Sequence, residues 1–241
     1  MDFKRAKKLI LGRLYKDLIE LFVQEKAILA GGAITSVFGN LPLNDYDIYF
    51  KNTSHRDKTV KFFDDENNGL ELLSETKNAK TYNSGQCKIQ LILRKDTFFD
   101  NPIDLVRTFD FTACMGSYDF NSSFFILEPR FSPDLASRRL VYNKDSTSAL
   151  HSLWRVQKYI NKGFTIESPE LIKIALVFAE RYRNMKILGD LKEELSPFNP
   201  FAYEGLKQYV ESNASFNLKE LLNIIDSFNI IDPLPFTEND Y

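Results

Sequence analysis

The sequence predicts an α+β fold, with a mixed head of short strands and helices over residues 1–142 and a helical region over residues 143–241. Two observations lead to this prediction. Before residue 143, short β-rich runs alternate with helical patterns, whereas after it apolar residues recur at helical spacing. The chain has 241 residues, of which 44% are hydrophobic and 14% aromatic, so it is able to bury a sizeable core.

The elements of the head follow from local apolar patterns and from the turn residues between them. Leu11, Leu14 and Leu18 recur at helical spacing, whereas Tyr46 and Ile48 alternate with polar residues as in a strand. In chain order, the expected elements are a helix at 4–24, a strand at 27–30, a helix at 33–38, a strand at 45–50, a helix at 55–66, strands at 79–82 and 88–93 joined by a turn at 83–85, a helix at 103–107, and strands at 111–118 and 124–127.

Helices dominate the sequence from Ser146 onward. The first has an apolar face and ends at Gly163, and Ser168 followed by Pro169 begins a second that runs to about residue 185. Two further helices are expected at 201–211 and 217–226. Residues 143–241 are therefore predicted to form a helical C-terminal domain.

Composition narrows the class of protein. A net charge of -2 gives no global basic bias of the kind common in nucleic-acid-binding proteins, although a local basic groove is compatible with it. No run approaches the roughly 18 apolar residues of a membrane span, so no membrane partner is expected. Cys87 and Cys114 are predicted to be reduced and buried, with a disulfide as the alternative, and this fits a cytoplasmic protein.

The segment from Ala27 to Phe50 carries the chemistry. A strand that ends in Gly31-Gly32 and turns into a helix lets the backbone approach a ligand closely. The N–H groups at such a helix start favour an anion such as phosphate. The plainer interpretation of two glycines is an ordinary turn.

Asp45 and Asp47 follow on the next predicted strand. Residues two apart in a strand project from the same face, so both carboxylates are expected to point one way. Two adjacent carboxylates raise each other's proton affinity, and a cation between them removes that repulsion. Mg²⁺ prefers oxygen ligands, often carboxylates together with substrate phosphates. A solvated strand edge is the alternative for the aspartates alone, but the combination with Gly31-Gly32 favours a metal and nucleotide site.

These motifs resemble the signature of the nucleotidyltransferase superfamily. The closest likeness is to the head and neck of the tRNA nucleotidyltransferase/poly(A) polymerase family. Residues 103–119, which contain Asp110-Phe111-Thr112, and residues 153–166, which look like the first neck helix, extend the resemblance. It implies a metal-dependent enzyme that moves a nucleoside monophosphate from a nucleoside triphosphate to an acceptor hydroxyl and releases pyrophosphate. The implied cofactor is Mg²⁺ or Mn²⁺, and RNA is a candidate acceptor.

The resemblance also implies roles for individual residues. Asp45 and Asp47 would be catalytic metal ligands. A third carboxylate is normally supplied by a neighbouring strand, where this chain has Gln90, so Asp110 is the expected third catalytic and metal-binding residue; a turn aspartate bonded to backbone is its alternative. The candidate nucleotide-binding residues are Gly31, Gly32, Thr35, Ser36, Arg155 and Lys158. An exposed polar helix face is the alternative for the last four, and for Arg138 and Arg139 a solvated pair is expected.

The chain departs from the family in places that matter. Relatives that add CCA to tRNA carry an arginine where Thr35 and Ser36 stand, and two arginines where Thr108 and Phe109 stand. These differences argue against CCA addition. They also motivate the alternative of a catalytically inactive nucleotide- or RNA-binding, regulatory protein with the same fold. The acceptor, the preferred base and the oligomeric state are left open by the sequence.

Overall fold

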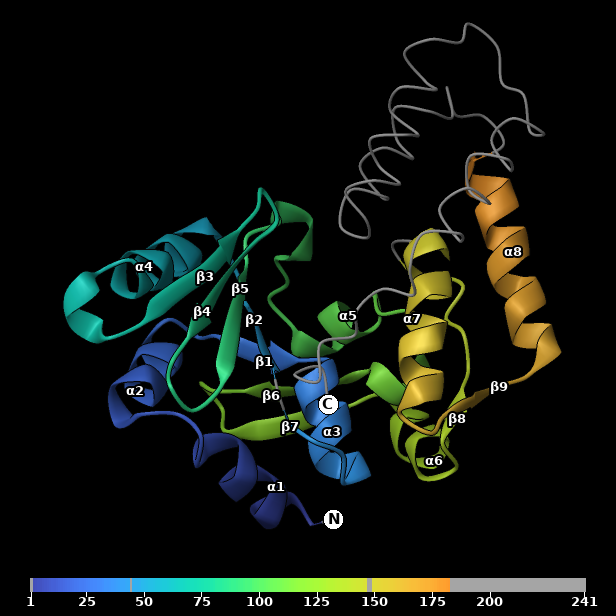
Figure 1. Ribbon diagram of the computed structural model, residues 1–241, viewed down its shortest axis with the longest axis horizontal. Coiled ribbons are helices and arrows are strands. Elements are labelled where there is room, and N and C mark those ends of the chain that lie inside the picture. The colour runs from blue at the N-terminus through green and yellow to red at the C-terminus, as the bar shows by residue number, and fades with distance from the viewer. Residues whose placement is uncertain (1, 44, 147–148, 183–241) are drawn as a thin grey trace, which may run out of the picture.

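The structure is a computed structural model that describes residues 2–43, 45–146 and 149–182. In this part a seven-stranded sheet is covered by helices, and a pair of long helices stands beside it (Figure 1). The predicted helices at 201–211 and 217–226 lie outside the described residues, and the division of the chain at residue 143 stays a prediction. Among the described helices, none combines the length and apolarity needed to cross a membrane.

The sheet is mixed, with the strand order β3-β4-β5-β2-β1-β6-β7. At its centre, β2 runs parallel to β5, whereas β1 is antiparallel to both β2 and β6. The strands are β1 (Ile28–Ala30), β2 (Asp45–Tyr49), β3 (Glu71–Glu75), β4 (Ala79–Asn83), β5 (Lys88–Ile92), β6 (Gly116–Asp119) and β7 (Phe124–Leu127). The mixed sheet with flanking helices confirms the α+β prediction.

Helices cover both faces of this sheet. The Phe22 and Phe63 rings, from α2 and α4, stack at 6.1 Å on the face into which Tyr46 points. On the other face a smaller core joins Ile28 and Ala30 to α5. The helices are α1 (Phe3–Leu11), α2 (Lys16–Gln24), α3 (Gly32–Gly39), α4 (Thr53–Phe63), α5 (Pro102–Val106), α6 (Phe131–Ala136), α7 (Ala149–Asn161) and α8 (Ser168–Tyr182), and a two-stranded sheet pairs β8 (Arg139–Leu140) with β9 (Thr165–Ile166).

The long helix predicted at 4–24 is wrong in one respect, because the chain breaks into α1 and α2. The turn between them begins at Gly12, whose N–H bonds the Lys8 carbonyl. Arg13 then donates to the Leu43 carbonyl at 2.6 Å, and Tyr15 donates to the Ser84 carbonyl at 2.8 Å. These long-range bonds anchor the turn to the loops around β2 and β5, which periodicity alone does not reveal.

The strand predicted at 111–118 is also only half correct. Its first half is a 3₁₀ turn over Thr112–Cys114, in which Met115 N–H bonds the Thr112 carbonyl at 3.1 Å. Only Gly116–Asp119 pairs as a strand, β6. The apolar run is buried whether the backbone is turned or extended, so composition does not separate the two conformations.

Several elements were not predicted from the sequence. All five residues of β3 are exposed, so this edge strand lacks the alternation that marks a half-buried strand. Helix α6 contains Pro133 in its first turn, a position that tolerates proline, although we expected an irregular connection there. The short strands β8 and β9 were missed as well.

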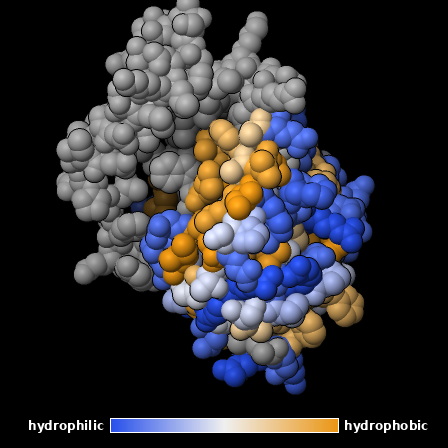
Figure 2. Space-filling view, turned by 90° about the vertical axis from the view of Figure 1, so that its right-hand side faces the viewer, coloured by the Kyte–Doolittle hydropathy of each residue, from blue (hydrophilic) through white to orange (hydrophobic). Residues whose placement is uncertain are grey.

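One side of α8 is apolar and exposed. Leu171, Ile172 and Leu176 have relative exposures of 39%, 58% and 64%. Figure 2 shows apolar residues gathered on the side of the molecule where α8 lies. The described part of the chain therefore leaves a hydrophobic strip on α8.

Gly116 lies in a tightly packed part of the core, where even one added methyl group would be crowded. A Cβ at this position would lie 2.7 Å from Ile34 Cγ2 and 2.9 Å from Phe131 Cε2, in the buried contact of β6 with α3 and α6. We expect Gly116→Ala to lower the free energy of unfolding by about 1–3 kcal/mol, as overpacking does, in urea denaturation. Gly32→Ala is the control, because a Cβ there meets nothing within 4 Å; equal stability of the two variants would contradict the prediction.

Candidate functional site

The two aspartates lie on one face of the central strand β2, as the alternation predicts. Tyr46 and Ile48 are fully buried on the opposite face, and the Tyr46 hydroxyl donates to the Ile10 carbonyl of α1 at 2.8 Å. This hydrogen bond fixes which face of β2 packs against α1. Asp45, which is exposed, and Asp47, which is half-buried, therefore point together away from α1.

The glycine turn lies against this carboxylate pair. Gly31 has φ 76° and ψ -125°, a conformation that favours glycine, and it caps the N-terminus of α3. A Cβ on Gly31 would lie 4.0 Å from Asp47 Oδ2, so turn and carboxylate are neighbours. The predicted strand, Gly-Gly turn and helix are thus present, and the start of α3 opens beside Asp47.

Thr35 and Ser36 are placed less favourably for a ligand. Both are buried in α3, and the Thr35 hydroxyl lies 3.0 Å from the Ala113 carbonyl and 3.2 Å from the Gly31 carbonyl. This hydroxyl is therefore engaged with the backbone that supports the turn. Phosphate binding by Thr35 or Ser36 stays a prediction.

Burial and like charge raise the pKa of Asp47 to about 6. Desolvation is the larger cause and the neighbouring Asp45 carboxylate the second, whereas Arg155, Lys158 and Lys162 oppose both. The charge of Asp47 is therefore costly to maintain in the protein alone. A bound cation would remove this cost, which is the behaviour expected of metal ligands.

Asp110 is 5% exposed, and its carboxylate is paired with the guanidinium of Arg155. Its Oδ1 accepts a hydrogen bond from Arg155 Nη1 at 2.9 Å and another from the Phe111 N–H at 3.0 Å. Arg155 Nη2 also donates to the Tyr159 hydroxyl at 3.1 Å. Burial is the largest single influence on Arg155 and disfavours its charge, but Asp110, Tyr159 and Cys114 together outweigh it, so the pKa of Arg155 is raised. The structure thus joins two predicted site residues, from the loop after α5 and from α7, in one ion pair.

The position of a third carboxylate beside Asp47 is taken by an amide. In the β2–β5 register Asp47 is paired with Gln90, whose Nε2 donates to Thr81 Oγ1 at 3.2 Å. Among the described residues, no three His, Cys, Asp or Glu side chains are grouped so that they could hold a metal ion. Asp45 and Asp47 fit a cation as a pair, whereas metal binding by Asp110 stays a prediction and would compete with Arg155.

Basic side chains of α7 and the turn after it lie within electrostatic range of the acidic pair. Arg155, Lys158 and Lys162 are spaced by three and four residues, which is the spacing of one helix face. All three act electrostatically on Asp47. Within the described residues, however, no ion pair joins Asp45 or Asp47 to any of them. The site therefore holds separated charges of opposite sign.

Three residues of this site were missed from the sequence. Lys162 continues the spacing of Arg155 and Lys158, a signal that was available. Tyr49 lies two residues beyond Asp47 on the same face, and its ring centroid is 5.9 Å from that of Phe109. The Phe109 ring lies 3.4 Å from a Cβ position on Gly31. An aromatic pair therefore borders the carboxylates and the turn.

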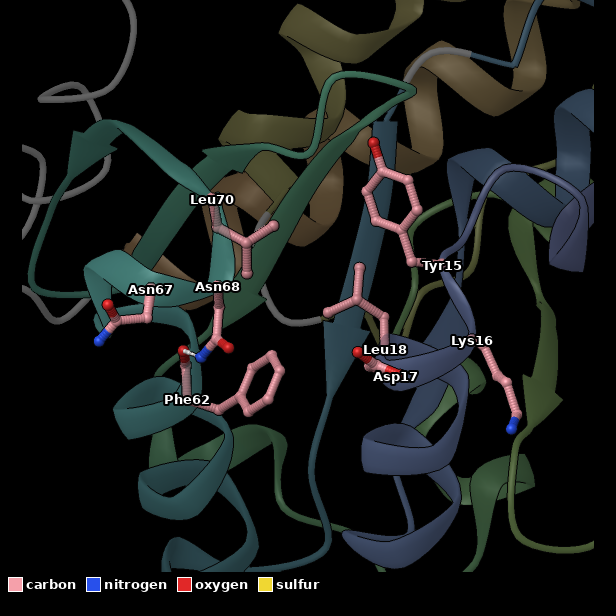
Figure 3. A pocket seen from close by; sticks show the side chains of 8 residues that line it. All are labelled: Tyr15, Lys16, Asp17, Leu18, Phe62, Asn67, Asn68 and Leu70. Carbon is pink, nitrogen blue, oxygen red and sulfur yellow. Dashed lines mark hydrogen bonds between the residues drawn. The ribbon is translucent and has the colours of Figure 1, made fainter.

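A separate hollow of about 290 Å³ lies on the side of the sheet covered by α2 and α4. Figure 3 shows side chains from the start of α2 and from residues 62–70 around it. Neither Asp45 nor Asp47 lines this hollow, and we assign no ligand to it. Cys87 and Cys114 lie elsewhere in the core, both buried and free, as predicted.

Comparison with known proteins places the chain in a family. A model of the Gabija anti-defense 2 family matches residues 2–138, more than half of the sequence. The chain belongs to the Gabija anti-defense 2 family. A relative named "Gabija anti-defense 2", from Bacillus phage SPbetaL7, is 33% identical over 247 residues. The match spans all of this chain but only 60% of the relative.

Solved structures similar to this family member include CCA-adding enzymes. One bound to CTP has a TM-score of 0.51 at 14% identity and matches 99% of this chain and 70% of its own. An apo form has a TM-score of 0.52 at 14% identity, with coverages of 91% and 65%. The Thermotoga maritima enzyme in complex with tRNA has a TM-score of 0.50 at 14% identity, with coverages of 94% and 60%. The nucleotidyltransferase-like fold is therefore confirmed.

Proposed function

We propose that this Gabija anti-defense 2 family member is a metal-dependent nucleotidyltransferase. It would move a nucleoside monophosphate from a nucleoside triphosphate to an acceptor hydroxyl and release pyrophosphate. One observation carries the proposal: within the described residues, the Asp45/Asp47 pair lies beside the Gly31 turn and within electrostatic range of the basic residues of α7 and the turn after it, with no ion pair between the two sets. A divalent metal with a triphosphate matches both sides, because the metal neutralises carboxylates and the phosphates neutralise cations.

Each part of the site has a role in this reaction. Asp45 and Asp47 would hold Mg²⁺ or Mn²⁺, which when bound supplies positive charge beside the reacting phosphate. The N–H groups at the start of α3, at Gly31 and Gly32, would orient phosphate oxygens. Arg155 and Lys158 would neutralise charge on the triphosphate and the leaving pyrophosphate. Catalysis would then rest on positioning and electrostatics, without a covalent intermediate on the protein.

The geometry supports a different role for Asp110 from the one carried over by resemblance. Its carboxylate fixes the Arg155 guanidinium with a hydrogen bond of 2.9 Å. A metal role would require Asp110 to leave this partner. We therefore propose that Asp110 acts by positioning Arg155, with third-ligand function as the alternative.

The name of the phage relative suggests the biological setting. We propose that the transferred nucleotide counteracts a Gabija defence, by modifying a component of that defence or a molecule on which it depends. RNA, a protein side chain and a small molecule are all candidate acceptors, because the described site contains no feature that selects among them. The chain spans 60% of the relative, so this role is proposed for the described site and not carried over from the whole relative.

Gln90 favours one competing function. An amide beside Asp47, in place of an acid, would suit a protein that binds a nucleotide or RNA and has lost turnover. This protein would retain the Gly31 turn and the basic face of α7. It would bind triphosphate without forming product.

Transfer of α-labelled ATP, CTP, GTP and UTP tests the proposal directly. The protein would be incubated with Mg²⁺ or Mn²⁺ and with total RNA or cell lysate as acceptors. We expect label to move to one acceptor class with the wild type and not with the double variant Asp45→Asn/Asp47→Asn. Triphosphate binding without transfer by the wild type, in lysate from cells that carry the defence, would instead support the binding protein.

A further inference from the structure

Lys162 is a half-buried cation without an acidic partner in the described part of the chain. Its ammonium Nζ lies 5.9 Å from the centroid of the Tyr159 ring. Burial lowers the pKa of Lys162, and Lys158 lowers it further by repulsion. A lysine in this setting is costly to keep charged unless an anion binds beside it.

The backbone of Lys162 is held in place by Arg138. Arg138 Nη1 donates to the Lys162 carbonyl at 3.1 Å, and Nη2 donates to the Gly39 carbonyl at 3.0 Å. Its guanidinium also lies 5.5 Å from the centroid of the Phe164 ring. Gly39 ends α3, the helix that begins at the glycine turn. Arg138 thus ties the end of α3 to the end of α7, and it is not the solvated surface residue expected from the sequence.

The three cations of the basic face are not equivalent. Arg155 forms an ion pair with Asp110, whereas neither Lys158 nor Lys162 forms an ion pair within the described residues. Lys162 also feels the charge of Asp45, so its ammonium lies in the electrostatic range of the acidic pair. The uncompensated positive charge of the site is therefore concentrated at the end of α7.

We propose that Lys162 contacts the phosphates of the bound nucleoside triphosphate and that Arg138 is its positioning residue. The inference rests on the proposed nucleotidyltransferase site. An ammonium on a flexible stem provides three donors to phosphate oxygens. The bridge from Gly39 to Lys162 sets the distance between these donors and the helix start at the glycine turn, where the same phosphates would be bound.

The test compares Lys162→Met, which removes the charge, with Lys162→Arg, which keeps it. Binding of a non-hydrolysable ATP analogue with Mg²⁺ would be measured by calorimetry, and transfer kinetics would be measured in parallel. We expect Lys162→Met to raise the Kd and the KM for the triphosphate by about 10- to 100-fold, the scale of a charged hydrogen bond. Lys162→Arg should stay within about 3-fold of the wild type, because the charge is kept. Lys61→Met on α4, where Lys61 is exposed, is the matched control and should leave both constants unchanged.

A double-mutant cycle tests the role of Arg138. If Arg138 acts through Lys162, Arg138→Met should weaken triphosphate binding in the wild type and have little further effect in Lys162→Met. If Arg138 has a purely structural role, Arg138→Met should weaken triphosphate binding equally in the wild type and in Lys162→Met. That result would overturn the positioning role of Arg138. Thermal unfolding of every variant checks that the fold is retained.

The outcomes separate the two proposals. Normal binding by Lys162→Met, or equal losses in Lys162→Met and Lys162→Arg, would overturn the role of Lys162 and leave the nucleotidyltransferase assignment intact. A wild type that neither binds the analogue nor transfers label would overturn the proposed function, and the role of Lys162 with it. Weak binding by Lys162→Met with recovery in Lys162→Arg would support both.

Discussion

Asp47→Asn is expected to abolish nucleotidyl transfer and, at neutral pH, to make the folded protein more stable than the wild type. Loss of a metal-binding carboxylate should reduce transfer by about 1,000-fold or more, the upper range seen when one electrostatic contact to a transition state is removed. The gain in stability has a separate cause. Asparagine removes a charge that is desolvated and repelled by Asp45.

The pH dependence of this gain follows from the raised pKa. Asp47 has a pKa of about 6 in the folded protein, against an ordinary value of 3.8. The folded state therefore binds the proton more tightly, so the contribution of Asp47 to stability is fully present below about pH 4 and is lost as the pH rises through 6. The asparagine that replaces it does not titrate. The wild type and Asp47→Asn should have similar free energies of unfolding near pH 4. By pH 7 the free energy of unfolding of the variant should exceed that of the wild type by at most about 3 kcal/mol.

Urea denaturation from about pH 4 to about pH 8 without divalent metal measures this difference. Asp100→Asn, in an exposed loop, is the control and should show no such pH-dependent gain. Added Mg²⁺ should stabilise the wild type and not Asp47→Asn, because a ligand that binds only the folded state raises its stability. Retained transfer, or a variant that is less stable at every pH, would contradict the expectation.

Arg155→Met is expected to destabilise the fold by up to about 3 kcal/mol, the lower end of the range for breaking a buried ion pair, because the Arg155 side chain is 30% exposed. Asp110 would remain buried without its cation, and the Tyr159 hydroxyl would lose a donor. The measurement is the free energy of unfolding in urea. In the double variant Asp110→Asn/Arg155→Met the uncompensated charge is absent, so we expect stability to recover in part. Additive losses would indicate that the two side chains do not act as a pair.

The variant Asp110→Asn distinguishes the two roles proposed for Asp110, which are positioning Arg155 and binding a metal ion. If Asp110 positions Arg155, Asp110→Asn should weaken triphosphate binding while the affinity for Mn²⁺ alone stays unchanged. If Asp110 is the third metal ligand, the affinity for Mn²⁺ should fall as well. Titration of Mn²⁺ by electron paramagnetic resonance, beside calorimetry with an ATP analogue, distinguishes these results, with Asp100→Asn again as the control.

Short-range patterns in the sequence predicted the central residues of the site. The alternation in β2 placed Asp45 and Asp47 on one face, because successive side chains of a strand point to opposite sides. The pair Gly31-Gly32 marked the turn between β1 and α3, since Gly31 adopts a positive φ. Helical spacing likewise identified α7 with Arg155 and Lys158. These features depend on residues a few positions apart, so the sequence by itself determined them.

Only the tertiary structure decided which distant groups meet. Asp110 and Arg155 are 45 residues apart, and their ion pair depends on how α7 packs on the head. Gln90 stands beside Asp47 because β5 runs parallel to β2 in one register, and that register results from non-local strand pairing. Arg138 bridges Gly39 and Lys162 because packing brings together the ends of α3 and α7, which are far apart along the chain. Local patterns fix the direction in which a side chain points, whereas its partner is set by packing between segments that are far apart along the chain.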